Sequence, residues 1–248
     1  MKYFLAFFRL VVVYFGMSLN GIILGLLFVC SFGKLRRFNA EFLGPCFCRL
    51  ILKFIGIRLI VTNPEKLPQN LHFAKVMYIF NHNSFLDIFI IQSLGLKKTR
   101  PIISTRTRKI LPLFFSTFAI GSHYIPFKDQ PVERLNFFKK LTLWIKNNPS
   151  ENLICAPEGV HTFKYEISKF NKGIFHTALL SKIPICPIFF DIPKESNPLE
   201  SYFYKSGVVK ITVMDIIETK TWCEEKLSKH IEEVRNIFVN KNDEINHV

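Results

Sequence analysis

From about Pro64 onward, short apolar runs alternate with segments of helical periodicity, and no other feature limits the possible folds as strongly. Runs rich in β-branched and aromatic residues predict strands over Lys75–Phe80, Pro101–Thr105, His123–Phe127, Asn152–Ala156, Pro184–Ile192 and Val208–Ile217. Apolar residues at helical spacing predict helices over Ser84–Leu94, Lys109–Ile120, Val132–Asn147, Phe170–Lys182 and Trp222–Val239. This alternation predicts an α/β sheet, and the long apolar strands indicate that helices cover both of its faces.

The first 33 residues follow a different pattern, because no charged residue occurs from Leu10 to Phe32. A helix over these 23 residues would be about 35 Å long, enough to cross a hydrocarbon core of about 30 Å. The run is too long for a signal peptide, and no small-residue cleavage pattern with a polar mature start follows it. Ser18, Asn20, Gly21 and Gly25 interrupt its apolar character, so a tilted or interfacial helix is the alternative. We predict a transmembrane or membrane-embedded helix over residues 1–33.

The chain is strongly basic, and much of its positive charge gathers near this helix. Lys and Arg number 33 against 19 Asp and Glu, which gives a net charge of +14. Residues 1–60 contain eight basic residues and a single acid, Glu41, so that this segment contributes 8 − 1 = +7. Hydrophobic residues make up 49% of the chain, which excludes intrinsic disorder and favours an anionic membrane surface over nucleic acid as partner. By the positive-inside rule, the basic cluster after residue 33 predicts that the rest of the chain is cytoplasmic.

A second apolar and basic segment occupies residues 34–63. Arg49, Lys53 and Arg58 recur at spacings of four and five, which is roughly one side of a helix over Phe42–Val61. We predict a basic amphipathic helix that lies in the membrane interface with its cations toward anionic headgroups. The alternative is an ordinary amphipathic core helix.

Six cysteines are scattered along the chain without a pair of C-x-x-C motifs, so a zinc site is not expected. Cys46 and Cys48 alternate and could be metal ligands, although small buried hydrophobic side chains explain them as well. We expect neither a metal ion nor a cofactor.

The segment FNHNSFLD, from Phe80 to Asp87, joins a predicted strand to a predicted helix. With the helix starting at Ser84, His82 lies in the preceding turn and can fold back onto Asp87. The carboxylate would then accept from one ring nitrogen and leave the other as a base, as in a catalytic dyad. Ser84 and Asp87 also fit a capping box at the start of the helix, which explains these two residues but not His82 and its flanking asparagines.

Two further segments accompany predicted strands. Pro157–His161 forms a loop at the carboxyl end of the strand that ends at Ala156, where open α/β sheets have their functional sites. As an alternative, Glu158 in this loop could be an ordinary solvated residue. The apolar run Ile183–Ile188 contains two prolines, which indicate an edge strand or an irregular strand.

Taken in this order, the segments resemble the motifs of the glycerolipid acyltransferase family, whose best-known members are the 1-acylglycerol-3-phosphate acyltransferases. The family's Asn-His-x-x-x-x-Asp block corresponds to Asn81–Asp87, and its Phe-Pro-Glu-Gly-Thr-Arg block corresponds to Ala156–His161. The late Val-Pro-x-x-Pro-Val block corresponds to Ile183–Ile188, and Phe170–His176 is similar to the family's Phe-Lys-x-Gly-Ala-Phe-His stretch. The resemblance covers about residues 70–192 and implies a mixed sheet flanked by helices.

The resemblance implies transfer of a fatty acyl group from acyl-CoA or acyl carrier protein to the hydroxyl of a lysophospholipid such as 1-acylglycerol-3-phosphate. His82 would be the general base, oriented by Asp87. The substrate-binding residues implied with them are Asn81, Ser84, Arg106, Arg108, Lys128, Glu158, Gly159 and His161. The corresponding division of the chain continues with a catalytic domain over residues 64–220 and a C-terminal amphipathic helix and tail over residues 221–248.

Two arginines of the family pattern are replaced in this sequence. The Gly-x-x-Phe-Ile-x-Arg block ends here in Phe127, followed by Lys128, and the Arg of the Glu-Gly-Thr-Arg block is His161. In the family these arginines are associated with the phosphate of the acceptor, and neither replacement offers a planar bidentate fork. Arg106 and Arg108 are candidates to take over that contact, and a lysophospholipid diester is an alternative acceptor.

Other functions remain as alternatives. A lysophospholipid hydrolase would use water in place of the lipid hydroxyl, but the Gly-x-Ser-x-Gly elbow typical of such enzymes does not occur in this sequence. A non-catalytic lipid-binding protein would account for the charge and the apolar content but not for the pair His82 and Asp87. A nucleic-acid binder would explain the net charge alone.

Overall fold

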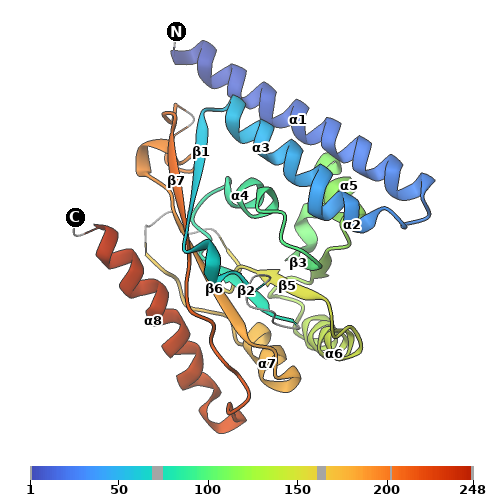
Figure 1. Ribbon diagram of the computed structural model, residues 1–248, viewed down its shortest axis with the longest axis vertical. Coiled ribbons are helices and arrows are strands. Elements are labelled where there is room, and N and C mark those ends of the chain that lie inside the picture. The colour runs from blue at the N-terminus through green and yellow to red at the C-terminus, as the bar shows by residue number, and fades with distance from the viewer. Residues whose placement is uncertain (1, 69–74, 161–165, 202, 247–248) are drawn as a thin grey trace. The chain divides into compact units, whose positions relative to one another are not determined.

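The computed structural model spans residues 1–248 and describes all of them except 1, 69–74, 161–165, 202 and 247–248. The chain divides into two compact units, whose elements are labelled in Figure 1. Unit 1 comprises Met1–Ile60, Ser84–Tyr124 and Ile192–Val209, and unit 2 comprises Val61–Asn83, Ile125–Asp191 and Lys210–Val248. The chain passes between the units several times. The division into segments 1–33, 34–63, 64–220 and 221–248 stays a prediction.

Unit 1 is mainly helical. Its helices are α1 (Lys2–Cys30), α2 (Arg36–Phe38), α3 (Gly44–Phe54), α4 (Asp87–Ser93) and α5 (Leu111–Ala119), accompanied by the π-helical turn η1 (Asn39–Leu43) and the 3-10 turns η4 (Thr105–Lys109) and η5 (Lys194–Ser196). Strand β3 (Thr99–Ser104) lies next to β4 (His123–Ile125) in the strand order. Strands β1 (Ile57–Thr62) and β7 (Gly207–Val213) each begin in unit 1 and end in unit 2.

Glycines allow α1 to approach its neighbours in unit 1 closely (Figure 1). A side chain at Gly16 would meet Ile51 of α3, and a side chain at Gly21 would overlap the backbone of Pro112 in α5. Leu24 of α1 is buried in a small apolar cluster at the end of α5. Because α1 shares its packing with α3 and α5, it is an integral part of unit 1 and not a separate appendage.

The contacts of α1 with the rest of unit 1 include buried polar side chains, whereas its exposed surface is apolar. Arg9 and Asn20 are buried, and the Arg9 guanidinium donates to the carbonyl of Tyr204 and, at 2.8 Å, to Ser206 Oγ. The large apolar side chains that α1 exposes are Tyr3, Phe4, Leu5, Phe7, Phe8, Leu10, Val11, Tyr14, Phe15, Leu19, Ile22, Leu26 and Val29. By length and composition α1 could cross a membrane, and only 17% of its most apolar stretch is buried within the protein.

Unit 2 is built on a mixed sheet. In the order β7-β6-β2-β5, strand β2 (Met77–Phe80) is parallel to β5 (Asn152–Cys155) and to β6 (Ile185–Asp191), and β6 is antiparallel to β7. The other elements of unit 2 are helices α6 (Pro131–Asn147), α7 (Lys172–Ser181) and α8 (Leu227–Asn246) and the turns η2 (Pro64–Lys66) and η6 (Glu224–Lys226). This mixed sheet with accompanying helices confirms the predicted fold class.

Aromatic side chains fill the core of unit 2 beside α8. Phe238 of α8 is fully buried, and its ring centroid lies 6.3 Å from that of Phe189 in β6 and 5.6 Å from that of Phe170. Three further apolar residues at helical spacing along α8 are also buried, namely Leu227, Ile231 and Val234. The helix continues to Asn246, beyond its predicted end at Val239.

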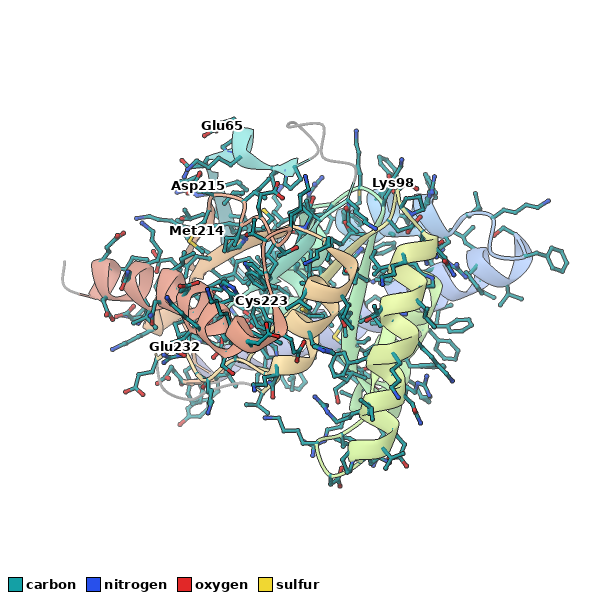
Figure 2. The ribbon with its side chains drawn as sticks, turned by 90° about the horizontal axis from the view of Figure 1, so that it is seen from below. Glu65, Lys98, Met214, Asp215, Cys223 and Glu232 are labelled. Carbon is teal, nitrogen blue, oxygen red and sulfur yellow. The ribbon has the colours of Figure 1, made fainter. Side chains whose placement is uncertain are left out.

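Opposite charges pair on the surface of unit 2. Lys66 Nζ lies 2.8 Å from Asp215 Oδ1 and links η2 to the segment after β7, where Figure 2 labels Asp215. On α8, Lys229 Nζ lies 3.9 Å from a carboxylate oxygen of Glu233. Unit 2 therefore has an apolar interior and a charged surface, as expected of a protein in contact with water.

The six predicted strands all have counterparts, but the predicted helix over Phe42–Val61 is wrong in its second half. The helix α3 ends at Phe54, and Ile57–Thr62 forms β1 instead. Gly56 lies between them with a φ of +85°, a conformation that glycine adopts without steric cost. The chain turns at this residue and leaves the helix.

The remaining helix, α3, has the buried face expected of a core helix. Ile51 and Leu52 are buried, and Arg49 Nε donates to the carbonyl of Ser93 in α4 at 2.8 Å. Arg49 and Lys53 are both exposed and, four residues apart, lie on roughly the same side of the helix. One face of α3 is thus a core face of unit 1, and the membrane contact of its cations stays a prediction.

Candidate active site

The FNHNSFLD segment forms the connection between β2 and α4. Strand β2 ends at Phe80, and α4 begins at Asp87, three residues later than the predicted start at Ser84. The residues between them are irregular, and His82 lies among them as expected. The boundary between the compact units falls after Asn83, so His82 belongs to unit 2 and Asp87 to unit 1. The contact of the two side chains stays a prediction.

The side chain of Asn81 extends the pairing of β2 with β6. Its Oδ1 accepts from the backbone N–H of Phe190 at 2.7 Å, and its Nδ2 donates to the carbonyl of the same residue at 3.0 Å. Asn81 is fully buried, and its carboxamide continues the sheet where the backbone pairing of β2 stops. The predicted substrate contact of Asn81 stays a prediction.

Ser84 and Asp87 are linked by a hydrogen bond just before α4. The Ser84 N–H donates to Asp87 Oδ2 at 3.3 Å, and Ser84 Oγ accepts from the N–H of Leu86 at 3.1 Å. The Ser84 hydroxyl also donates to Asn197 Oδ1 at 2.8 Å. Both Ser84 and Asp87 are buried. Because α4 begins at Asp87 and its N-cap residue is Leu86, which makes no side-chain cap, the capping box is found only in the bond from the Ser84 N–H to the carboxylate. The substrate contact of Ser84 stays a prediction.

His82 is fixed through its backbone. Its N–H donates to Glu158 Oε1 at 2.8 Å, and its ring packs edge-on against Phe80 with the centroids 6.1 Å apart. Burial lowers the pKa of His82 to about 4, and the negative charge of Glu158 opposes this effect. The ring is therefore neutral at physiological pH, which is the protonation state that a general base needs.

Glu158 binds backbone amides of two different segments. Its Oε1 accepts from His82, and its Oε2 accepts from the N–H of Ser168 at 2.9 Å. The residue is only 2% exposed, so the solvated-loop alternative is wrong. A buried carboxylate with two N–H donors holds both segments in place, and we call this arrangement, His82 N–H to Glu158 to Ser168 N–H, the Glu158 bridge. The contact of this carboxylate with a substrate stays a prediction.

The turn after Glu158 depends on glycine. Gly159 has a φ of +70°, in the left-handed region. Asn171 Nδ2 donates to the carbonyls of Pro157 and Glu158 at 2.8 and 2.7 Å, and a Cβ at Gly159 would approach this nitrogen to 2.9 Å. Gly159 therefore shapes the loop. The sequence does not identify Asn171 and Ser168 as site residues. The Asn171 side chain donates to backbone carbonyls, and Ser168 takes part through its own backbone N–H, so neither contact belongs to a recognisable motif.

The basic candidates belong to different parts of the molecule. Arg106 and Arg108 are exposed in η4 of unit 1, where the Arg108 guanidinium stacks over the Tyr124 ring at 4.3 Å from its centroid. Lys128 is exposed in unit 2. His161 lies outside the described residues. The contact of these side chains with an acceptor phosphate stays a prediction.

Each unit contains a buried thiol, Cys48 in unit 1 and Cys155 in unit 2. Cys155 is the last residue of β5 and precedes Glu158 by three positions, and burial raises the pKa of its thiol. Burial also raises the pKa of Cys48 to about 12, which disfavours the thiolate that a metal ion would need. Within the part of the chain that the structure describes, no group of three or more His, Cys, Asp or Glu side chains could hold a metal ion.

Comparison with known proteins supports the family resemblance that the sequence motifs indicate. A sequence model of the family described as Acyltransferase matches residues 58–191, more than half of the chain. The 1-acyl-sn-glycerol-3-phosphate acyltransferase of Cocos nucifera is 27% identical over 169 residues, which are 67% of this chain and 53% of that protein. The protein of the same name from Saccharomyces cerevisiae is 25% identical over 204 residues, which are 81% of this chain and 65% of that protein. The chain thus spans about half the length of the first of these relatives.

The fold has a counterpart among solved structures. The crystal structure of the 1-acyl-sn-glycerophosphate (LPA) acyltransferase PlsC from Thermotoga maritima is similar with a TM-score of 0.66 and 16% sequence identity, over 93% of this chain and 95% of that chain. At this identity the likeness concerns the fold. The family match over residues 58–191 includes the loop of His82 and the Glu158 bridge. The chain therefore belongs to the glycerolipid acyltransferase family.

Proposed function

We propose that this protein transfers a fatty acyl group from a thioester to the free hydroxyl of a lysophospholipid. The donor is acyl-CoA or acyl carrier protein, and the acceptor is 1-acylglycerol-3-phosphate or a related lysophospholipid. The observation that carries the proposal is His82, a neutral imidazole in the loop after β2 whose backbone is fixed by the Glu158 bridge. The names of the relatives support the same class of acceptor.

In the proposed reaction, His82 accepts the proton of the lipid hydroxyl as that oxygen attacks the carbonyl carbon of the thioester. The tetrahedral oxyanion collapses, the carbon–sulfur bond breaks, and the imidazolium returns its proton to the leaving thiolate. The products are a lipid ester and a thiol, and His82 is neutral again. A thiol with a pKa of about 8.5 needs no strong acid to leave, and a positioned general base contributes about 10²–10⁴-fold.

The role proposed for Asp87 follows from the low pKa of His82. An imidazole whose pKa lies near 4 is a weak base, so the proton transfer needs a group that stabilises the imidazolium as it forms. A carboxylate that accepts from the other ring nitrogen supplies this stabilisation and selects the tautomer. The Oδ2 of Asp87 accepts from the Ser84 N–H, which supports a fixed orientation of this carboxylate.

We propose that Arg106 and Arg108 supply the contact to the acceptor phosphate, in place of the arginines that Phe127 and His161 replace. A phosphate monoester carries up to two negative charges, and a charge-assisted hydrogen bond to it contributes roughly 1.5–3 kcal/mol. In a competition between equimolar lysophosphatidic acid and a lysophospholipid diester, the wild type should prefer the monoester. Arg106→Ala or Arg108→Ala should remove that preference, and a wild type that prefers the diester would contradict this assignment.

Unit 1 supports a position at the membrane surface, where substrate and product of this reaction reside. The helix α1 exposes rings such as Phe4, 73% exposed, and Phe15, 65% exposed, while it buries the cation Arg9. Exposed cations such as Lys53 and Arg58 would add roughly 1 kcal/mol each on an anionic surface. We propose that α1 lies in the bilayer and that the acyl transfer takes place at the cytoplasmic face, as the excess of basic residues after α1 favours.

The test is an acyl-transfer assay on membranes that contain the protein. Membranes with wild type or His82→Ala are incubated with a labelled acyl donor and a panel of lysophospholipids, and the lipid products are separated. A labelled phospholipid that depends on His82 is the expected product. Labelled free fatty acid instead of phospholipid would indicate a hydrolase, and lipid binding without any product would indicate a non-catalytic lipid-binding protein.

A further inference from the structure

The helix α8 contacts the loop that carries part of the Glu158 bridge, although α8 lies beyond residues 58–191 of the family match (Figure 1). Arg235 of α8 donates from Nη2 to the carbonyl of Ile167 at 2.8 Å and from Nε to the carbonyl of Ser168 at 3.2 Å. The two acceptors are consecutive backbone carbonyls. A planar guanidinium can serve both at once, which a lysine ammonium does less well.

The same residue, Ser168, links this contact to His82. Its carbonyl accepts from Arg235, and its N–H donates to Glu158, whose other oxygen accepts from the His82 N–H. All four residues belong to unit 2. A continuous series of hydrogen bonds thus runs from α8 to the backbone of the proposed general base.

A second contact holds the loop on the same helix. Phe170, two residues after Ser168, packs edge-on against Phe238 of α8, three residues after Arg235. Phe170 and Phe238 are buried, whereas the side chain of Arg235 is 27% exposed. The apolar contact therefore holds the loop on α8. Arg235, at the edge of the buried region, fixes the orientation of the peptide groups of the loop.

The remaining contact of Arg235 orients the guanidinium. Nη1 lies 2.8 Å from Glu232 Oε1, one helical turn earlier on α8, where Figure 2 labels Glu232. This pair leaves Nε and Nη2 directed to the loop carbonyls. A surface arginine without a role in the loop would make the ion pair with Glu232 but not the two contacts to the loop carbonyls.

We propose that Arg235 is a positioning residue for the acyl transfer, which acts on His82 through Ser168 and the Glu158 bridge. This inference rests on the proposed function of His82 as general base. Because a displacement of about 1 Å at a reacting group can lower a rate by up to about 10²-fold, loss of Arg235 should act on turnover rather than on substrate binding.

The experiment compares Arg235→Ala with the wild type in the full-length protein in membranes or detergent. We expect kcat to fall about tenfold and KM to stay within about twofold. Arg235→Lys keeps a cationic donor for one carbonyl and should recover part of kcat. Lys229→Ala is the matched control, because it removes an exposed cation of α8 that pairs with Glu233 of the same helix, and it should leave kcat unchanged.

Hydrogen exchange of the backbone amides of Ser168 and His82 provides a readout that does not depend on turnover. Both amides should exchange faster in Arg235→Ala than in the wild type, because the carboxylate that accepts from them is less well held. If Arg235→Ala does not fold, Arg235→Lys is compared with the wild type instead. Its kcat should be lower and its amide exchange at Ser168 and His82 faster than in the wild type.

The results separate this inference from the proposed function. A wild type without transferase activity would refute the proposed function, while faster exchange at His82 in the variant would still support the positioning contact. Unchanged kcat and unchanged exchange in Arg235→Ala would overturn the inference. A rise in KM at constant kcat would also overturn it, because Arg235 would then act on substrate binding.

Discussion

The surface of helix α1 in unit 1 differs from the surface of unit 2. In unit 2 the ring of Phe238 lies in the interior, and the ion pair of Lys66 with Asp215 lies at the surface. In unit 1, α1 buries Arg9 and exposes apolar rings such as Phe4. A protein surrounded by water gains stability by burying apolar surface, so the exposed rings favour an apolar surrounding for α1. We therefore expect α1 and unit 2 to be adapted to different surroundings.

The largest effect we expect separates the chemistry of unit 2 from the membrane contact of unit 1. His82→Ala should lower turnover about 10²–10⁴-fold, because it removes the proposed general base. Binding to lipid vesicles and the circular dichroism spectrum should stay as in the wild type, since His82 lies in unit 2 outside the strands and helices. Turnover is measured with a labelled acyl donor, and vesicle binding by sedimentation.

Asp87→Asn is the companion variant to His82→Ala. The carboxamide keeps an oxygen for the Ser84 N–H but presents a poorer partner to an imidazolium, so turnover should lie between those of wild type and His82→Ala. If His82→Ala retained more than about a tenth of wild-type turnover, general base catalysis by His82 would be excluded, since such a base contributes at least about 10²-fold.

A charge on the exposed face of α1 tests the surrounding of unit 1. Phe15→Asp should weaken binding to vesicles roughly a hundredfold, because a carboxylate in hydrocarbon costs about 2.5–3.5 kcal/mol. Leu143→Asp is the matched control, since Leu143 is similarly exposed on α6 of unit 2. Sedimentation with vesicles of anionic lipid measures both. Equal weakening by the two variants would contradict the assignment of the membrane contact to unit 1.

The buried polar contacts of unit 1 should contribute more to stability than the surface ion pairs of unit 2. Arg9→Met leaves the Tyr204 carbonyl and the Ser206 hydroxyl without their cationic donor, and it should lower the free energy of unfolding by about 2–3 kcal/mol. Lys66→Met removes a surface ion pair and should cost less than about 1 kcal/mol. Chemical denaturation of both variants in the same detergent measures the difference, and a larger loss for Lys66→Met would reverse the comparison.

The smallest effect we expect is a pH dependence in unit 2. The unfolded chain protonates His82 near pH 6.5, whereas in the folded protein burial lowers its pKa to about 4. Between these values the unfolded state binds more protons, so the free energy of unfolding falls as the pH drops. From about pH 7 to about pH 5.5 the loss through this residue should be about 1 kcal/mol. Denaturation at both pH values should show this loss in wild type and a smaller one in His82→Gln.

The strands of unit 2 could be predicted from the sequence because apolar residues dominate them, as Met77–Phe80 illustrates with four buried residues. Strand β1 could not, because Arg49, Lys53 and Arg58 recur at spacings of four and five across its start, which favours a continuous helix. The signal against a continuous helix is Gly56, a residue common just after helix ends, followed by the β-branched residues of β1.

The motif residues of the site could be predicted from the sequence, but the hydrogen bonds that hold them in place could not. His82, Glu158 and Gly159 belong to recognisable blocks, but the Glu158 bridge ends on the N–H of Ser168, a group that every residue except proline has. Arg235 likewise bonds to backbone carbonyls. Contacts of this kind leave no residue pattern, so only the three-dimensional structure identifies them.

The buried thiol of Cys155 has a consequence for the fidelity of the proposed reaction. An accessible thiolate three residues before Glu158 would attack the thioester donor itself and trap the acyl chain on the protein as an acyl-cysteine. Burial raises the pKa of Cys155 and keeps it a thiol, which is a poor nucleophile. In the proposed reaction, Cys155 would therefore not compete with the lipid hydroxyl for the acyl donor.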